Sequence, residues 1–351
     1  MRTVEEGSQK NFSHKGRVIL VKNRKLKVAI AGAGMTGAFL YRLLRNRGYT
    51  VDIFDRDPGT KCGISPCAWG TSRGFVELVK ASGLDPEKYF LQHSDYVVMD
   101  GIRILADLAA FNKPALVKDL LQGAEIIHAP LHMAGYGRII DATGLSRVFL
   151  PALQEDITLP CIQWRIRTEA DLENQIKLGR IGYAWCFPLS NGEYHIGCGS
   201  LLSDPHKIMK ELGWIEKMAL ASKGKIICAC RGKIRITGPL YAQPFVRDDG
   251  PVEVWGVGEA IGCVAPLAGD GVVPGMRSVQ ILLDYWEDPG GYQKAILREF
   301  NWMKSERMVI DKLRSHEALG VKDAWVLKKN SRRMGMQVGL KEAILLLKNL
   351  R

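Results

Sequence analysis

Glycine spacing near the start of the chain predicts a phosphate-binding loop. Gly32-Ala-Gly34-Met35-Thr36-Gly37 has the pattern G-x-G-x-x-G. Gly32 would permit a tight turn, Gly34 would let a pyrophosphate approach the backbone, and Gly37 would let a helix pack close to the preceding strand. The helix N-terminus adds unpaired N–H groups and the positive end of the helix dipole. Asp55, 18 residues after Gly37, could accept hydrogen bonds from an adenosine ribose, so the segment predicts a dinucleotide site.

A second glycine-rich stretch follows a strand pattern at residues 252–258. Glu259 comes directly after a glycine, and Gly269 and Gly271 precede a helical pattern. Glycines at a helix start leave bare N–H groups where an anionic group could sit. The stretch resembles the second flavin motif of the glutathione-reductase-type flavoproteins, where Asp usually stands at the Glu259 position. The resemblance implies that Glu259 binds the ribityl chain and that the glycine turn faces the pyrimidine end of the flavin.

Residues 139–146 fit a third element of these flavoproteins, a strand ending in a glycine turn near the adenosine. The three elements follow in the usual order over residues 27–285, which implies FAD rather than NAD. With the cysteine segment described below, the expected FAD-binding residues are Gly32, Gly34, Met35, Thr36, Gly37, Asp55, Lys61, Cys62, Gly63, Asp141, Gly144, Gly258, Glu259, Pro266, Gly269, Gly271 and Val272.

Residues 182–199 predict a β-hairpin that turns at residues 190–193. Alternation along the first strand puts Tyr183, Trp185 and Phe187 on one face. Three aromatic rings there could form an apolar wall for a substrate. They could equally be an ordinary sheet face packed on helices, since aromatic side chains are usually buried.

This hairpin resembles the geranylgeranyl reductase family of flavoproteins. The matching residues are Tyr183-x-Trp185-x-Phe187-Pro188, then Gly192 and Gly197-x-Gly199; a second match is Lys61-Cys62-Gly63, where the family has a cysteine loop near the flavin. The likeness covers most of residues 27–300, although the family loop usually reads Lys-Pro-Cys-Gly. It implies reduction of isolated C=C bonds in polyprenyl chains.

The implied reaction moves a hydride from N5 of reduced FAD to one alkene carbon, while a proton reaches the other. Aromatic rings would stabilise positive charge developing on the alkene, so Tyr183 and Trp185 are candidate catalytic residues. Cys62 is the third candidate, as a proton donor or redox-linked thiol; its alternative role is a small buried apolar side chain. The expected substrate-binding residues are Tyr183, Trp185, Phe187 and Pro188.

Other function classes stay open at this stage. An aromatic monooxygenase on a related fold usually carries an extra Asp-Gly motif, for which only Asp100-Gly101 and Asp249-Gly250 are available. A halogenase has an aromatic-Trp-x-Ile-Pro element that resembles residues 183–188. A flavoprotein that keeps FAD without catalysis is the remaining class. These alternatives rest on analogy of fold rather than on physical argument.

The order of elements predicts an α/β fold, α+β overall. It combines a Rossmann-like parallel sheet that binds FAD, an antiparallel sheet over the substrate and a C-terminal helical segment. Residues 83–132 are expected to contribute helices to the first of these, and residues 292–318 to be helical. The expected divisions are a basic tail at 1–26, a discontinuous FAD domain at 27–150 and 250–290, a substrate domain at 151–249, and a helical region at 291–351.

The distribution of charged residues along the chain indicates which kinds of partner the protein could bind. The chain carries +12, and its first 27 and last 31 residues each hold eight Lys/Arg against two acidic residues, which leaves a neutral body. A nucleic-acid groove would normally charge the body as well, so we expect no nucleic acid. Basic ends fit solvated tails or an anionic surface. Leu340, Ile344 and Leu347 share one helix face, which could lie on a membrane or cap the protein core.

Composition and cysteine use complete the expectations. No run of about 18 apolar residues could span a bilayer, and no signal-peptide pattern is seen, so we expect reduced thiols and a cytoplasmic location, with peripheral membrane contact as an option. Cys228-x-Cys230 and Cys62-x4-Cys67 lack a matching His or Cys pair, so no metal site is expected. The expected partners are a polyprenyl lipid and an electron donor, either NAD(P)H or ferredoxin.

Overall fold

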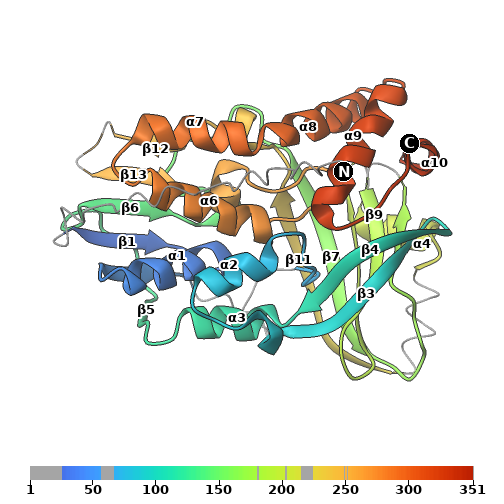
Figure 1. Ribbon diagram of the computed structural model, residues 1–351, viewed down its shortest axis with the longest axis horizontal. Coiled ribbons are helices and arrows are strands. Elements are labelled where there is room, and N and C mark those ends of the chain that lie inside the picture. The colour runs from blue at the N-terminus through green and yellow to red at the C-terminus, as the bar shows by residue number, and fades with distance from the viewer. Residues whose placement is uncertain are drawn as a thin grey trace, which may run out of the picture.

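Two β-sheets lie side by side, with helices over the first and a row of C-terminal helices running from the first toward the second (Figure 1). The computed structural model describes residues 26–56, 67–179, 182–201, 204–214, 224–248, 250 and 252–350. Residues 1–25 of the expected basic tail at 1–26, the segment Lys61-Cys62-Gly63 and Asp249 lie outside these residues.

The first sheet has the order β12-β13-β6-β1-β2-β5. Its strands are β1 (Lys27–Ala31), β2 (Thr50–Phe54), β5 (Ile126–Ile127), β6 (Arg138–Asp141), β12 (Val246–Arg247) and β13 (Glu253–Gly256). All neighbours pair in parallel except β12 with β13. Val28, Ala29 and Ile30 are fully buried, as expected for a central parallel strand covered on both faces.

Register brings four strand ends to one edge of this sheet. Ala31 of β1 pairs with Phe54 of β2 and with Asp141 of β6, and Gly256 of β13 also pairs with Asp141. The loops that leave these strands therefore start next to one another. This crevice at the carboxyl ends of parallel strands is where such folds bind ligands.

Three helices belong to this half, and the first and last of them follow the helical patterns expected from the sequence. They are α1 (Met35–Asn46), α2 (Phe75–Ala81) and α6 (Val272–Asp284). After α1 the chain turns at Gly48, which adopts φ +81°, as expected for a glycine just past a helix end. Short 3-10 helices occur at Pro86–Lys88, Gly144–Ser146, Pro239–Tyr241, Gly258–Ile261 and Arg332–Met334.

The second sheet has the order β11-β7-β10-β9-β8-β3-β4. Its strands are β3 (Phe90–Met99), β4 (Ile102–Phe111), β7 (Thr158–Arg167), β8 (Gln175–Leu178), β9 (Gly182–Pro188), β10 (Glu193–Ser200) and β11 (Lys225–Arg235). Only β3 and β8 pair in parallel, so the expected mainly antiparallel sheet is present. The short helix α4 (Pro205–Glu211) packs on β7 and β10.

Residues 83–132 were expected to contribute helices to the first half, but most of the segment is not helical. Residues 90–111 form the β3–β4 hairpin, and the main helix there is α3 (Lys113–Leu120). Asp100 and Gly101 both have positive φ and make the hairpin turn, as in the tight turns that suit antiparallel strands. Asp100-Gly101 is therefore a structural turn in this sheet.

The boundaries between the two halves also differ from the expected ones. The hairpin at 90–111 belongs to the second sheet because β3 pairs with β8, although it falls inside the expected FAD domain 27–150. In the other direction, β12 falls inside the expected substrate domain 151–249 but pairs with β13 of the first sheet.

The C-terminal region is helical. Its helices are α7 (Pro289–Glu299), α8 (Asn301–Arg314), α9 (Val321–Ser331) and α10 (Leu340–Asn349). The helix expected at 292–318 is thus two helices that meet at Phe300. On α10, Ala343, Leu346 and Leu347 are buried in a cluster with residues of β3 and β4. The helix face that was considered for membrane contact therefore packs in the protein core.

No helix in the described part of the chain is long and apolar enough to span a bilayer.

Arg235, at the end of β11, joins the two halves. Its side chain is 3% exposed. Its guanidinium donates to the carbonyl oxygens of Gly144, Leu145 and Glu259, and to the Asp156 carboxylate at 2.8 and 2.9 Å. One buried cation of the second sheet thus satisfies three carbonyl groups in the loops of the first.

Candidate functional site

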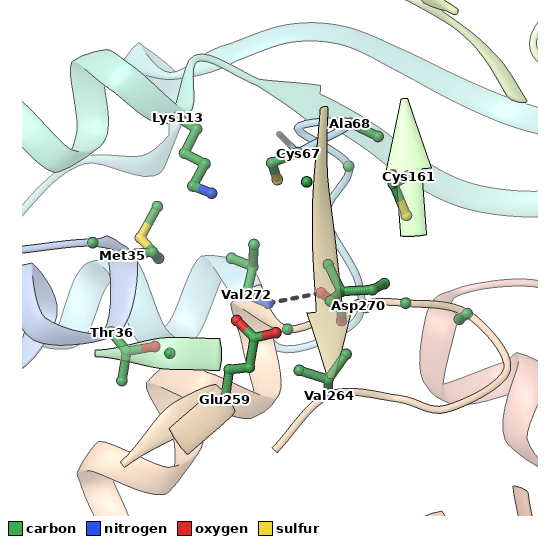
Figure 2. A pocket seen from close by; sticks show the side chains of 18 of the residues that line it. Met35, Thr36, Cys67, Ala68, Lys113, Cys161, Glu259, Val264, Asp270 and Val272 are labelled. Atoms are coloured by element: carbon green, nitrogen blue, oxygen red, sulfur yellow. Dashed lines mark hydrogen bonds between the residues drawn. The ribbon is translucent and has the colours of Figure 1, made fainter. Parts of the chain in front are cut away.

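A cavity of about 1060 Å³ lies between the two sheets and extends to the C-terminal helices. It receives the loops at the carboxyl edge of the first sheet, the inner face of the second sheet, and residues of α8, α9 and α10. This volume is at the upper end of the usual range for ligand pockets, so it has room for a large cofactor and a substrate together. Figure 2 shows the part near Glu259 and Asp270.

The glycine loop is closed on its inner side and open toward the cavity. A Cβ at Gly37 would lie 1.8 Å from the Gly32 carbonyl oxygen, whereas a Cβ at Gly34 would meet no atom within 4 Å. Gly34 is the N-cap residue of α1, and as a glycine it has no side chain that could accept from the N–H groups of the first helical turn. The first N–H groups of α1 are therefore left for a ligand, and the space beside Gly34 suits a pyrophosphate.

Asp55 and Glu259 bring two carboxylates to this part of the cavity. Asp55 Oδ2 accepts from the Ala33 N–H at 2.9 Å, which fixes it beside the glycine loop. Glu259 Oε1 accepts from the Arg235 N–H at 2.6 Å, and Figure 2 shows the carboxylate pointing into the cavity. Burial raises the pKa of Glu259, while Arg235 acts in the opposite direction. Both groups can accept hydrogen bonds from sugar or ribityl hydroxyls.

Most of the expected cofactor residues meet at this cavity. Those that line it are Gly32, Gly34, Met35, Thr36, Asp55, Gly144, Glu259, Gly269, Gly271 and Val272. Gly37, Asp141, Gly258 and Pro266 do not line it.

Asp141 and Gly258 do not line the cavity but shape the loops that form it. The Asp141 carboxylate is fully buried and accepts from the Thr143 hydroxyl and from the N–H groups of Thr143, Phe149 and Leu150. It shapes the turn after β6 and has no surface left for a cofactor. A Cβ at Gly258 would lie 2.7 Å from Thr36 Oγ1. This glycine therefore lets the loop after β13 approach α1.

Asp270 was missed by the sequence reasoning, which chose its glycine neighbours. Its carboxylate accepts from the Ser72 hydroxyl at 2.6 Å and from the Val272 N–H at 2.9 Å, so it caps the start of α6 and ties it to the segment before α2. Burial raises the pKa of Asp270, and these hydrogen bonds oppose the rise. An acidic residue two positions before a helix was the available signal.

Lys113 was also missed. It is the first residue of α3, it lines the cavity, and Figure 2 shows its ammonium group pointing inward. Its charge lowers the pKa of Glu259. A cation here can contact an anionic cofactor group. No sequence signal identified it, because the segment before it was expected to be helical and not a strand that ends at the cavity.

The three aromatic residues of β9 form the expected row along the cavity. Ring centroids are 5.7 Å apart for Tyr183 and Trp185, and 6.5 Å apart for Trp185 and Phe187, whose planes are 28° apart. All three line the cavity, as does Pro188. Trp185 is held by its indole N–H, which donates to Gln163 Oε1 at 3.2 Å. The Tyr183 hydroxyl donates to the Ala268 carbonyl at 2.6 Å, and burial raises its pKa.

Gly197 explains part of the Gly-x-Gly pattern on the neighbouring strand. It is the register partner of Trp185, and a Cβ there would lie 2.3 Å from Trp185 Cζ2. The indole therefore lies over a position where only hydrogen fits. This spacing of aromatic residues and glycines sets the orientation of one ring toward the cavity.

The polarity of the cavity lining differs between the two sides of the aromatic row. At the β11 edge it includes the exposed side chains Arg231 and Lys233. On the other side of β9 the lining is mainly apolar, with Ser94, Asn174, Asn330 and Ser331 as polar members. This mainly apolar part, called the apolar end below, is formed by Met99, Leu108, Ile176, Leu178, Leu327, Met334, Met336 and Leu350. The cavity thus has a cationic edge, an aromatic middle and an apolar end.

Metal and disulfide chemistry finds no support among the residues the structure describes. No group of three or more His, Cys, Asp or Glu in that part of the chain could hold a metal ion. The seven described cysteines form no disulfide. Cys67 and Cys161 line the cavity, and burial raises the pKa of Cys161 to about 12, which keeps it a thiol.

Comparisons with known proteins agree with this architecture. No family profile matches the chain. An uncharacterized protein of Methanocaldococcus jannaschii is 24% identical over 306 residues, which is 73% of this chain and 82% of that protein.

Several solved structures share the fold. A geranylgeranyl bacteriochlorophyll reductase-like protein of Thermoplasma acidophilum is 17% identical, with a TM-score of 0.68 over 92% of this chain and 95% of that one. A tryptophan 6-halogenase of Streptomyces toxytricini is 13% identical, with a TM-score of 0.64 over 92% and 90%. A probable FAD-dependent monooxygenase of Pseudomonas aeruginosa is 14% identical, with a TM-score of 0.56 over 86% and 99%. The chain therefore has a fold found among FAD-dependent flavoproteins.

Proposed function

We propose that the protein is an FAD-dependent oxidoreductase that reduces isolated C=C bonds in a polyprenyl, geranylgeranyl-type lipid. The fold shared with a probable FAD-dependent monooxygenase and with a geranylgeranyl bacteriochlorophyll reductase-like protein supports this class. The open space at Gly34 and the uncapped start of α1 fit a pyrophosphate, and the carboxylates of Asp55 and Glu259 fit its sugar and ribityl hydroxyls.

FAD bound here would supply, in its reduced form, the hydride for the reaction. The side chains then have three tasks. Glu259, Lys113 and the start of α6 hold the cofactor in place. Trp185 and Tyr183, fixed by Gln163 and by the Ala268 carbonyl, present their rings to the reacting part of the substrate. The apolar side chains beside these rings would bury the hydrocarbon chain of the substrate.

The observation that carries the lipid proposal is the apolar end of the cavity. A small aromatic substrate would need only the space beside the aromatic row, but the lining continues through β8, β3 and β4 to α9 and α10. Transfer of an isoprenoid chain into such a space is favourable by about 25 cal/mol per Å² of apolar surface buried. Arg231 and Lys233 at the opposite edge would suit an anionic head group.

A monooxygenase or halogenase remains the alternative, because structures of both kinds share the fold. Of the two Asp-Gly pairs considered for a monooxygenase motif, Asp100-Gly101 is a hairpin turn and Asp249 lies outside the described residues. The long apolar extension favours the reductase over both alternatives. NAD(P)H or ferredoxin as electron donor, and contact with a membrane surface, stay predictions.

The test uses the flavin spectrum of the purified protein loaded with FAD. The flavin is reduced with dithionite under anaerobic conditions, and geranylgeranyl diphosphate is added. We expect the oxidised spectrum to return only when the lipid is present, with saturated product. A flavin that stays reduced with the lipid but is reoxidised by oxygen, with hydroxylation of an added aromatic acid, would favour the monooxygenase. A flavin that turns over neither compound would favour the non-catalytic alternative.

A further inference from the structure

Glu306 is a buried carboxyl group on the wall of the cavity, outside the cofactor loops. It lies on α8, its residue is 3% exposed, and it lines the cavity. Its Oε2 accepts from the Leu267 N–H at 3.1 Å. A buried carboxyl is costly to ionise unless it is paired with a cation or held by several donors, and no ion pair to Glu306 is found among the described residues.

Glu306 is tied to the same segment as the aromatic row. Leu267, whose N–H it accepts, is followed by Ala268, whose carbonyl accepts from Tyr183. One helical turn further along α8, Ile310 packs in a cluster with Trp185, and both Leu267 and Tyr183 border that cluster. The carboxyl is therefore placed at the wall where the reacting part of a substrate would meet Tyr183 and Trp185.

The other acidic groups lining the cavity are engaged differently. Asp270 is held by the Ser72 hydroxyl and the Val272 N–H, Glu259 by the Arg235 N–H, and Asp55 by the Ala33 N–H. All three lie with the cofactor loops. Glu306 is the cavity carboxyl that comes from the C-terminal helices, among the described residues, and thus from the substrate side.

The surroundings of the Glu306 carboxyl also favour its protonated form. Burial raises the pKa of Glu306 to about 7, against the opposing effects of the Leu267 N–H, the Asn330 side chain and the Arg333 guanidinium. Arg307, the next residue on α8, faces away from it, since its guanidinium bonds to Asp311 and to the Thr237 carbonyl. A carboxyl that is half protonated near neutral pH has the acidity that suits a general acid.

We propose that Glu306 is the proton donor for reduction of the alkene, a proposal that rests on the function proposed above. The O–H bond of Glu306 breaks and its proton forms a C–H bond at one alkene carbon. The other carbon takes the hydride, with its electron pair, that reduced FAD supplies, so the alkene is reduced and the flavin oxidised. The carboxylate left behind is reprotonated from solvent, which restores the acid.

The experiment measures the rate of anaerobic flavin reoxidation by geranylgeranyl diphosphate as a function of pH, for the wild type, Glu306→Gln and Glu299→Gln. Glu299 is an exposed residue of α7 paired with Arg277, so its variant controls for loss of a carboxylate. We expect the wild-type rate to fall as pH rises through about 7, because the protonated acid is required. Glu306→Gln should lower the rate by about 10²–10⁴-fold and remove this pH dependence, while Glu299→Gln should match the wild type.

A second readout needs no turnover. Infrared difference spectra of the FAD-loaded protein, without lipid, should show a protonated carboxyl band that disappears as pH rises through about 7 and is missing in Glu306→Gln. If Glu306→Gln fails to fold, the wild-type profiles still decide, because a reoxidation rate independent of pH and no titrating band would overturn the proposal.

The outcomes separate the two proposals. A wild type that is reoxidised by the lipid, with a Glu306→Gln variant that keeps its rate and its pH profile, would remove Glu306 from the reaction and leave the reductase in place. A wild type that the lipid never reoxidises would remove the reductase and, with it, the role of Glu306.

Discussion

Gly34 is the N-cap of α1 and Gly37 lies in its first turn, and the structure gives the two glycines different roles. Gly37 is closed in by the Gly32 carbonyl, while Gly34 faces open space in the cavity. One glycine therefore serves the packing of α1 on β1, and the other keeps room for a ligand. The sequence pattern alone identified both, because a local turn followed by a helix is encoded within a few residues.

Alanine at these two positions should separate stability from cofactor binding. Gly34→Ala should leave thermal unfolding of the FAD-free protein unchanged, since φ is −68° there, but weaken FAD binding by tenfold or more, about 1.4 kcal/mol. Gly37→Ala should lower the free energy of unfolding by about 1–3 kcal/mol. FAD titration and thermal unfolding of both variants check this; a Gly34→Ala protein that binds FAD as tightly as the wild type would contradict it.

Glu306 makes a prediction about stability as well as about rate. Its pKa is raised from 4.5 to about 7 in the folded protein, so the folded state binds a proton more tightly than the unfolded state. The stabilisation is complete below about pH 4.5 and is lost as pH rises through about 7. Glu306→Gln, which never ionises, should therefore gain up to about 3 kcal/mol relative to the wild type between pH 5 and pH 8.

Denaturant unfolding of both proteins at these two pH values measures the effect. A difference between wild type and Glu306→Gln that does not change with pH would mean that the Glu306 carboxyl has an ordinary pKa, and Glu299→Gln should show no such change.

At the level of elements, whether a strand or helix could be predicted depended on how local and regular its sequence pattern is. The first strand–helix–strand unit and the β9–β10 hairpin were correct, because their signals are local and regular. The β3–β4 hairpin was missed because two register shifts interrupt the pairing of these strands, one between Phe90 and Gln92 and one between Ser94 and Tyr96. Such bulges break the alternation of apolar residues on which a strand prediction depends.

The same cause explains the residues of the site that were missed. Lys113 was not identified because it follows that unrecognised hairpin. Glu306 was not identified because its hydrogen-bond partner Leu267 is distant in the sequence. Membership of the cavity is decided by tertiary packing, and no local pattern marks a helix residue that packs against a remote loop.

The β9–β10 pair carries a prediction of its own. Gly197→Ala should push the Trp185 indole from its place, because the new Cβ would lie 2.3 Å from Cζ2. We expect altered tryptophan fluorescence and at least a tenfold slower reoxidation by lipid, since a displacement of about 1 Å near a reacting group can cost that much or more. Flavin content should stay the same.

Gly320→Ala is the matched control, because its Cβ would meet no atom within 4 Å and its φ is −119°. It should behave as the wild type in both measurements. Unchanged fluorescence and an unchanged rate in Gly197→Ala would mean that the ring has another position available.

On the scale of the whole molecule, the buried side chain of Arg235 is one of the links between the two sheets. Arg235 of the second sheet bonds to the Gly144, Leu145 and Glu259 carbonyls of the first, and its own N–H holds the Glu259 carboxylate. The cofactor loops and the substrate sheet are thus positioned by the same residue. The sequence did not indicate this link, because the partners of Arg235 are distant from it along the chain.

Arg235→Met should lower the free energy of unfolding by about 3–5 kcal/mol, because the Asp156 carboxylate and three carbonyl groups lose their partner. FAD affinity should fall too, since the Gly144, Leu145 and Glu259 carbonyl groups lose the guanidinium that positions the cofactor loops, although the backbone N–H of residue 235 still holds the Glu259 carboxylate. Unfolding followed both by flavin fluorescence and by circular dichroism checks this. Arg277→Met, which removes a surface pair with Glu299, should cost no more than about 1 kcal/mol. Equal effects of the two changes would show that Arg235 does not couple the sheets.

The meeting of distant strand ends at one edge of the first sheet also has a consequence for how the protein is made. The loop at Gly34 leaves the ribosome early, but its partners at Gly258 and Glu259 are translated about 220 residues later. At about 5–20 residues per second that is a delay of roughly 10–45 seconds. During this interval the nascent chain contains only the N-terminal part of the proposed nucleotide site. We therefore expect FAD to bind only after translation has passed α6.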